Sequence, residues 1–245
     1  MRKLYLDKLQ RKKDYMIVKN EKFDVIFTNA ENNRSFNRAT EEGIKNISSI
    51  EDDFEVEQVI FLKQIHSDKI YIHSFKSNIK ELEGDAIVTK EKNTAIGVFT
   101  ADCVPIILVD ETEGVVAAIH SGWRGTFNSI TSKTIKKMQG EFGCKACNIR
   151  AFVGPHIRKC CYEVSEELKE KFIEKYPKVD KKELFNGRNL NLEICIEQNL
   201  KDAGINFENM FSLEMCTYCS KEVELFSYRK SSGAYGRMFA FVYLK

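Results

Sequence analysis

Two side chains with reactive chemistry flank a pair of apolar runs near the middle of the sequence. Cys103 precedes the run VPIILVD, and His120 ends the run GVVAAIH, with a short charged connector between the runs. Such runs are typical of buried strands, and the connector fits a hairpin loop. If the loop is centred on Thr112, Val104 lies opposite His120. Cys103, opposite Ser121, is then a diagonal neighbour of the imidazole.

A thiol beside an imidazole supports two chemistries. The histidine can activate the cysteine as a nucleophile, or both can ligate a metal ion. His66, in FLKQIHSDKI, ends another apolar strand-like run and is a candidate third ligand. Zinc held by His66, Cys103 and His120 would keep a fourth tetrahedral position for water or substrate, as catalytic zinc does. Spacing alone leaves both interpretations open, because no compact motif ties His66 to the other two residues.

Arginines near these residues could bind an anion. Arg124 follows His120 in SGWRGTF, where a helix is expected to begin. Free backbone N–H groups, the helix dipole and the guanidinium would all favour an anion there; the alternative is a surface arginine. Arg229 and Arg237 flank a predicted C-terminal hairpin around Ser231–Ala234 and are either further anion contacts or solvated charges.

Two aspartates are candidate acid–base or orienting groups. Asp102 directly precedes Cys103, and Asp85 lies in GDAIVT. Because adjacent strand residues point to opposite faces, a structural role for the Asp102 carboxylate is equally open. His73, in IYIHSF, has apolar neighbours at alternate positions and is expected to be structural.

Short runs rich in branched and aromatic residues predict the strands that must position these groups. The predicted strands cover residues 24–28, 58–64, 85–89, 95–100, 104–109, 114–120, 149–154, 223–229 and 237–244. Helical patterns cover residues 126–143, 165–177 and 191–205, with Thr126 and Ser165 as N-caps and Gly204 as a C-terminal stop. Many strands with fewer, irregularly placed helices indicate an α+β or layered α/β fold.

Composition describes an ordinary globular protein. The 245 residues carry a net charge of +2, with 43% hydrophobic and 30% charged residues. No strong field or long apolar span marks a nucleic-acid or membrane partner. No signal peptide or interdomain linker is evident, so we expect one cytoplasmic domain over residues 1–245.

The eight cysteines are therefore expected to be mostly reduced thiols. Two CxxC pairs occur, Cys144/Cys147 and Cys216/Cys219. A four-thiolate zinc site is one interpretation of them. The pairs are much further apart than in a compact zinc ribbon, which favours buried structural thiols.

Seven segments in order resemble one bacterial family: KQIHSDKI, GDAIVT, TADCVPIILVD, AAIHSGWRGT, VGPHIRKCCYEV, CTYC with LFSYRK, and YGRMFAFV. This family of laccase-domain, polyphenol-oxidase-like proteins is regarded as purine nucleoside phosphorylases with adenosine deaminase activity. It also includes a peptidoglycan editing factor. The segments run from Lys63 to the C-terminus.

The resemblance implies a fold, a metal and a reaction. The fold would be a layered α/β/β/α sandwich with mixed sheets. The family's metal ligands fall on His66, Cys103 and His120, with Zn²⁺ as the expected ion and copper as an alternative. The substrates would be inorganic phosphate and purine nucleosides such as adenosine, inosine and methylthioadenosine, handled by a monomer or homodimer. Asp102 and Arg124 join Cys103 and His120 as candidate catalytic residues.

Two segments depart from the family pattern. A glycine-rich TRxGGVS segment is replaced by TNAENNRSFNRAT at residues 28–40, and His156 and Arg158 stand where small residues are commoner. Three other functions remain as alternatives. They are a cysteine hydrolase or peptidoglycan-editing factor using Cys103 and His120, a copper polyphenol oxidase, which too few imidazoles disfavour, and a non-enzymatic interaction module.

Overall fold

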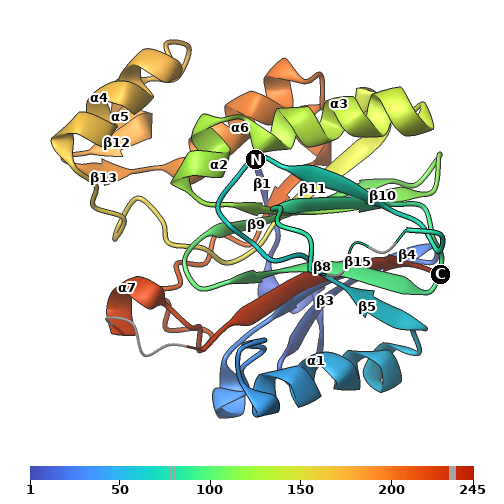
Figure 1. Cartoon of the computed structure of the whole chain (residues 1–245). Helices are drawn as coiled ribbons and strands as arrows, with labels where there is room; N and C mark the ends of the chain where they lie inside the picture. The colour runs from blue at the N-terminus through green and yellow to red at the C-terminus, as the bar shows by residue number, and fades with distance from the viewer. Residues whose placement is uncertain (78, 80, 232–235) are drawn as a thin grey trace.

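The computed structural model describes residues 1–77, 79, 81–231 and 236–245. In this part of the chain, two mixed β-sheets of seven and six strands pack face to face. Helices cover the outer face of each sheet (Figure 1). The predicted α/β/β/α layering is therefore confirmed.

The seven-stranded sheet carries most of the residues singled out above. Its strand order is β1-β14-β11-β9-β10-β7-β6, antiparallel in the centre and parallel toward both edges. The bounds are β1 (Arg2–Lys3), β14 (Met210–Ser212), β11 (Ile149–Val153), β9 (Val104–Asp110), β10 (Val115–Ser121), β7 (Ala86–Thr89) and β6 (Ile70–His73).

The six-stranded sheet has the order β2-β3-β4-β15-β8-β5. Its strands are β2 (Gln10–Lys12), β3 (Tyr15–Lys19), β4 (Phe23–Thr28), β15 (Met238–Leu244), β8 (Thr94–Thr100) and β5 (Gln58–Ile60); a separate ribbon pairs β12 (Phe185–Asn186) with β13 (Asn189–Leu190). Apolar side chains such as Phe27, Val98 and Ile107 fill the space between the sheets. Burial of this inner layer fixes how the strand ends of one sheet meet those of the other.

Helices complete the two outer layers. On the seven-stranded side lie α2 (Trp123–Phe127), α3 (Ile130–Phe142), α4 (Glu166–Lys175), α5 (Lys181–Leu184) and α6 (Leu192–Asp202). The six-stranded sheet is covered by α1 (Glu41–Phe54), and α7 (Tyr228–Ser231) precedes β15; short 3₁₀ turns occur at Leu6–Lys8, Glu31–Asn33, Ala146–Asn148 and Phe207–Asn209. Among the described helices, none combines the length and apolar character needed to cross a bilayer.

Eight of the nine predicted strands are present, and two predicted helix ends are confirmed. Ser165 caps α4 by accepting from the Leu168 amide, and Gly204, with φ of +90°, follows α6. Thr126 is not an N-cap, because α2 already begins at Trp123. Its hydroxyl instead lies 2.9 Å from that of Ser121.

The prediction at the C-terminal end of the chain was partly wrong. Residues 224–227 form no strand, and Tyr228–Ser231 is the short helix α7. β15 already pairs with β4 on one side and β8 on the other, so no edge remains for a hairpin partner. Of the predicted turn, residues 232–234 lie outside the described part of the chain. The predicted strand at 58–64 is also shorter, since β5 ends at Ile60.

The β9–β10 hairpin forms, but its register differs by one residue from the prediction. His120 pairs with Pro105 and Ser121 with Val104. The loop has four residues, since Asp110 pairs with Val115, and the Asp110 carboxylate accepts two amide hydrogens inside the loop. The prediction centred the loop on Thr112, whereas the observed centre lies half a residue further along the chain, so every pairing shifts by one.

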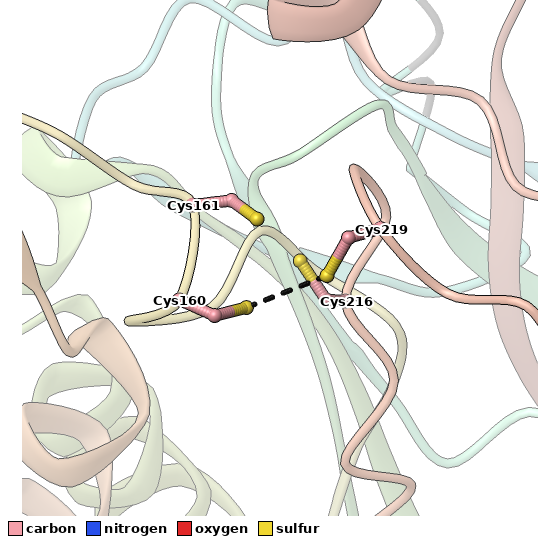
Figure 2. A group of neighbouring side chains, drawn as sticks. All are labelled: Cys160, Cys161, Cys216 and Cys219. Atoms are coloured by element: carbon pink, nitrogen blue, oxygen red, sulfur yellow. Dashed lines mark hydrogen bonds between the residues drawn. The ribbon is translucent and has the colours of Figure 1, made fainter.

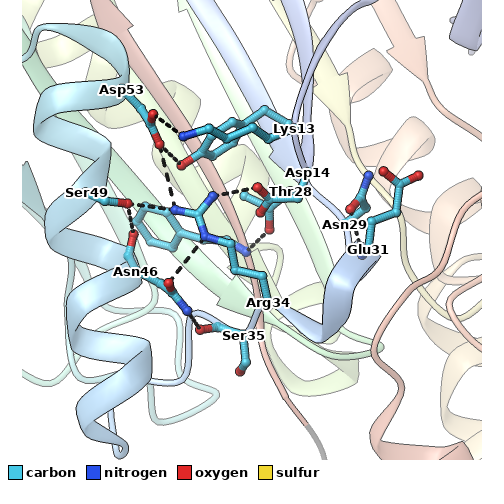
Figure 3. A network of polar contacts seen from close by, with 12 residues as sticks. Lys13, Asp14, Thr28, Asn29, Glu31, Arg34, Ser35, Asn46, Ser49 and Asp53 are labelled. Atoms are coloured by element: carbon cyan, nitrogen blue, oxygen red, sulfur yellow. Dashed lines mark hydrogen bonds and ion pairs between the residues drawn. The ribbon is translucent and has the colours of Figure 1, made fainter.

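Arg34 is the main side-chain anchor of the unusual segment 28–40. Figure 3 shows the Arg34 guanidinium between α1 and the turn before β3. It donates to Asp14 (2.5 Å) and to the Ser49 hydroxyl (2.7 Å), and it lies over the rings of Tyr15 and Phe36. This anchoring carries the next residues of the segment, including Arg38, to the rim of a cavity described below.

We predict that Arg34→Met lowers the free energy of unfolding by about 2–4 kcal/mol. The Asp14 carboxylate is 2% exposed, and it would lose its charged partner while still buried. Denaturant unfolding measures the change. The matched control is Arg11→Met, because Arg11 pairs with Glu31 at the surface and its loss should cost less than about 1 kcal/mol. Equal effects of the two substitutions would contradict this account.

Candidate active site

Three side chains from separate parts of the sequence converge at one end of the sheets. His66 lies in the loop between β5 and β6, Cys103 in the turn between β8 and β9, and His120 near the end of β10. Cys103 Sγ lies 3.7 Å from His66 Nε2, and one ligand atom from each of the three residues lies within 4.8 Å of the others. The two imidazole rings meet edge to face, with centroids 4.8 Å apart.

The Asp85 carboxylate organises this group. It is completely buried directly before β7, and its Oδ1 accepts from His120 Nδ1 at 2.8 Å. The same carboxylate accepts from the backbone amides of His66 (3.0 Å) and Ser67 (2.6 Å) and from the Ser67 hydroxyl. One buried anion thus orients the His120 ring and fastens the loop that carries His66. With Nδ1 engaged, the His120 Nε2 is the nitrogen left for a ligand.

The His66 loop has an unusual backbone conformation. His66 has φ of +58°, in the left-handed region that non-glycine residues adopt rarely. A side-chain clamp holds Gln64, two residues before His66, because the Gln64 amide group both accepts from the Phe99 amide and donates to the Phe99 carbonyl. The loop is therefore held on one side by Gln64 and on the other by Asp85.

The two histidines set the ionisation of the Cys103 thiol. Burial raises the pKa of Cys103, but the charge and hydrogen bonds of His120 and His66 outweigh it and bring the pKa to about 6. Burial lowers the pKa of His120, but the Cys103 thiolate and Asp85 raise it to about 9. A thiolate facing an imidazolium is therefore the expected state near neutral pH.

Gly122 leaves the space in which these ligand atoms meet. A Cβ at this position would lie 3.0 Å from Cys103 Sγ and 3.1 Å from His66 Cδ2. A thiolate and two imidazole nitrogens, with Asp85 behind one ring, form a donor set that suits zinc or copper. The residues present therefore fit a metal ion.

The candidate ligands open into a cavity of about 670 Å³. Its lining is rich in cationic and aromatic side chains. Among the described residues these are Arg38, Arg124, Arg229, Arg237, Phe99, Trp123, Tyr162 and Tyr228. Arg124 lies over the Trp123 ring at 4.5 Å, and Arg229 lies over the Tyr162 ring at 5.4 Å.

The structure brings Arg124 and Asp102 to this cavity in different ways. Arg124 is exposed on its wall, within the five-residue helix α2. The Asp102 carboxylate accepts from the Thr217 hydroxyl (2.6 Å) and from the Arg229 amide (2.7 Å). The two carboxylate oxygens of Asp102 thus hold the loop after β14 and the helix α7.

Sequence reasoning missed Arg38 in the wall, because the segment that carries it departs from the family pattern. His156 and Arg158 lie elsewhere, facing Glu193 on α6. His73 is buried in β6, close to Gln58.

Comparison with known proteins relates the chain to named relatives. A protein named purine nucleoside phosphorylase from Clostridium acetobutylicum is 44% identical over 96% of this chain and 97% of its own length. A protein named adenosine deaminase RL5, from an unknown prokaryotic organism, is 32% identical over 78% of this chain and 77% of its own length.

Solved structures share the fold. The Bacillus licheniformis protein YfiH superposes with a TM-score of 0.88 at 23% identity, over 98% of this chain and 100% of the other. YlmD from Geobacillus stearothermophilus gives a TM-score of 0.85 at 22% identity, over 97% and 98%. The family described as multi-copper polyphenol oxidoreductase laccase matches residues 27–245, and the chain belongs to that family.

Proposed function

We propose that the chain is a metal-dependent purine nucleoside phosphorylase that accepts adenosine, inosine and methylthioadenosine and also deaminates adenosine. One observation carries the proposal: His66, Cys103 and His120 meet at a cavity whose wall holds several arginines. A group that binds a metal and a wall that binds an anion then face the same substrate. The names of the relatives from Clostridium and from the unknown prokaryote support this reading.

The arginines would bind phosphate. A guanidinium can donate two parallel hydrogen bonds to a phosphate, and it stays charged at any working pH. Arg124 and Arg229 each stack on an aromatic ring, so both side chains are already restrained before phosphate binds. Binding would therefore cost them less conformational entropy. The bound phosphate would also stabilise the transition state, because its negative charge lies next to the sugar carbon C1′, which develops positive charge.

Aromatic side chains would hold the base and sugar. Phe99, Tyr162 and Tyr228 line the cavity, and base–aromatic stacking contributes about 1–3 kcal/mol per base. In phosphorolysis a phosphate oxygen bonds to C1′ while the C1′–N9 bond breaks. The bonding electrons leave with the purine, which takes up a proton to give free base and ribose 1-phosphate.

The metal ligands would serve both reactions. A bound ion would polarise the purine or lower the pKa of a water molecule to about 7, as deamination at C6 of adenine requires. Asp85 would keep His120 in the tautomer that presents Nε2. Asp102 would position Arg229 and Cys103 rather than touch the substrate, because its carboxylate is already engaged.

A cysteine hydrolase is the second candidate, and the lowered pKa of Cys103 favours it. Such an enzyme, including one that edits peptidoglycan, would keep its activity in a chelator and lose it on thiol alkylation. A copper polyphenol oxidase is less favoured, because the sequence has four histidines and two of them, His73 and His156, are buried away from the cavity. Activity gained with added copper would not by itself support it, since copper outcompetes zinc at such sites.

We predict that the purified protein converts adenosine and phosphate to adenine and ribose 1-phosphate, and adenosine alone to inosine. A strong chelator should abolish both reactions, and zinc should restore them. His66→Ala should lower kcat/KM at least 100-fold with unchanged folding. Chromatographic product analysis decides the outcome. The proposal would be contradicted if no adenine and no inosine formed. Full activity in metal-free protein would also contradict it.

Metal binding should depend on pH in a defined way. Between pH 6 and 9 the unliganded site has a Cys103 thiolate and a protonated His120. The metal must displace the His120 proton, so each ion bound releases about one proton from this pair, and apparent affinity rises about tenfold per pH unit. Calorimetry in buffers of different ionisation enthalpy measures the release. Affinity that stays constant from pH 6.5 to 8.5 would contradict the assignment.

Gly122→Ala should weaken metal binding at least tenfold without unfolding the protein. Its backbone is in an ordinary extended conformation, so the added methyl acts only by crowding Cys103 and His66. Gly125→Ala is the matched control, because a Cβ there meets its nearest neighbours only at 3.4 Å or more. A metal titration compares the two. Equal affinities would show that the metal does not bind beside Gly122.

A further inference from the structure

A second group of metal-ligating side chains lies outside the proposed active site. Figure 2 shows Cys160 and Cys161, from the loop after β11, facing Cys216 and Cys219, from the loop after β14. One sulfur atom from each of the four lies within 4.8 Å of the others, and the sulfurs of Cys160 and Cys219 are 3.6 Å apart. The less favoured interpretation of the sequence grouped Cys216 and Cys219 with Cys144 and Cys147, whereas the structure places them beside Cys160 and Cys161.

The backbone fixes these two loops before any ligand binds. The His156 amide donates to the Met215 carbonyl, and the Thr217 amide donates back to the His156 carbonyl. The Arg158 guanidinium bonds to the Glu214 carbonyl at 2.6 Å. Within the CxxC turn, the Ser220 amide donates to the Cys216 carbonyl. These hydrogen bonds hold the two loops side by side without using the sulfur atoms.

The spacing of the sulfurs fits a single tetrahedral ion. Zinc binds thiolate at about 2.3 Å, which places tetrahedral sulfurs about 3.8 Å apart. A cluster with several irons and inorganic sulfides would need its thiolates further apart. A bound cation would also offset the repulsion among four thiolates this close.

The solvent exposure of two of these four cysteines argues against a role in apolar packing alone. Cys160 and Cys219 are exposed, whereas a cysteine that serves only as a small apolar residue is usually buried. Of the four cysteines expected to be buried, Cys144 and Cys216 are buried, and Cys147 and Cys219 are exposed.

We propose that Cys160, Cys161, Cys216 and Cys219 bind one Zn²⁺ ion as a structural site that fastens two loops bordering the active-site cavity. Tyr162, directly after Cys161, lines that cavity. Thr217, inside the CxxC turn, donates to Asp102, the neighbour of Cys103. An ion in the four-cysteine site therefore stabilises the wall of the cavity without contacting a substrate. The proposal stands independently of the proposed function.

Metal analysis of the full-length chain tests the site. Elemental analysis of Cys219→Ser should show one zinc fewer per chain than the wild type. Cys147→Ser, which removes another exposed cysteine, should match the wild type. His66→Ala should retain the four-cysteine ion, so Co²⁺ loaded into this variant should show the intense visible and charge-transfer absorption of a tetrahedral cobalt thiolate. Equal zinc in Cys219→Ser and wild type, or no cobalt-thiolate absorption in His66→Ala, would overturn the proposal.

A measurement on the wild type avoids any folding defect of a variant. After zinc loading, a thiol reagent followed by peptide mass analysis should modify Cys147 quickly, and Cys160 and Cys219 at least tenfold more slowly. A chelator should remove that protection. Equal rates for the three exposed thiols in the zinc-loaded protein would overturn the proposal. A Cys160–Cys219 disulfide in protein kept under reducing conditions would do the same.

Discussion

The buried Asp85 carboxylate is the interaction on which the candidate active site depends. It bonds to the ring of His120 and to two consecutive amides of the His66 loop, so one anion sets the relative position of two candidate ligands. Burial raises the pKa of Asp85, but the hydrogen bonds from His120 and Ser67 lower it by a larger amount. The net pKa lies below the usual aspartate value, so the carboxylate stays ionised. Its contribution to stability is full above the pKa of an unfolded aspartate, near 4, and is lost as the pH falls through the lower folded value.

The two sheets bring this carboxylate to its partners. β7, which follows Asp85, pairs with β10, which carries His120, while β8 of the other sheet leads into Cys103. Because the sheets pack through a continuous apolar layer, strand ends from both meet at one cavity. Different polar groups hold the loops that border the cavity. Arg34 anchors segment 28–40. Asp102 and the proposed four-cysteine site hold the loops after β11 and β14.

Much of the fold followed from the sequence, because apolar runs and capping residues act locally. The strands around Cys103 and His120 and the N-cap at Ser165 are examples. The hairpin register was missed by one residue, since Asp110 and Val115 pair across a loop whose centre lies half a residue beyond Thr112. The grouping of Cys160 with Cys219 could not be predicted, because it arises from parallel pairing of β11 with β14. The place of Arg38 likewise depends on a tertiary anchor, Arg34.

An anomalous difference map at the zinc edge tests the central claim most directly. The crystals should come from a preparation that phosphorolyses adenosine. The account predicts a peak bonded to His66, Cys103 and His120 at about 2.0–2.3 Å, with one coordination position not filled by the protein. An active preparation whose crystals show no anomalous peak among these three side chains would contradict it.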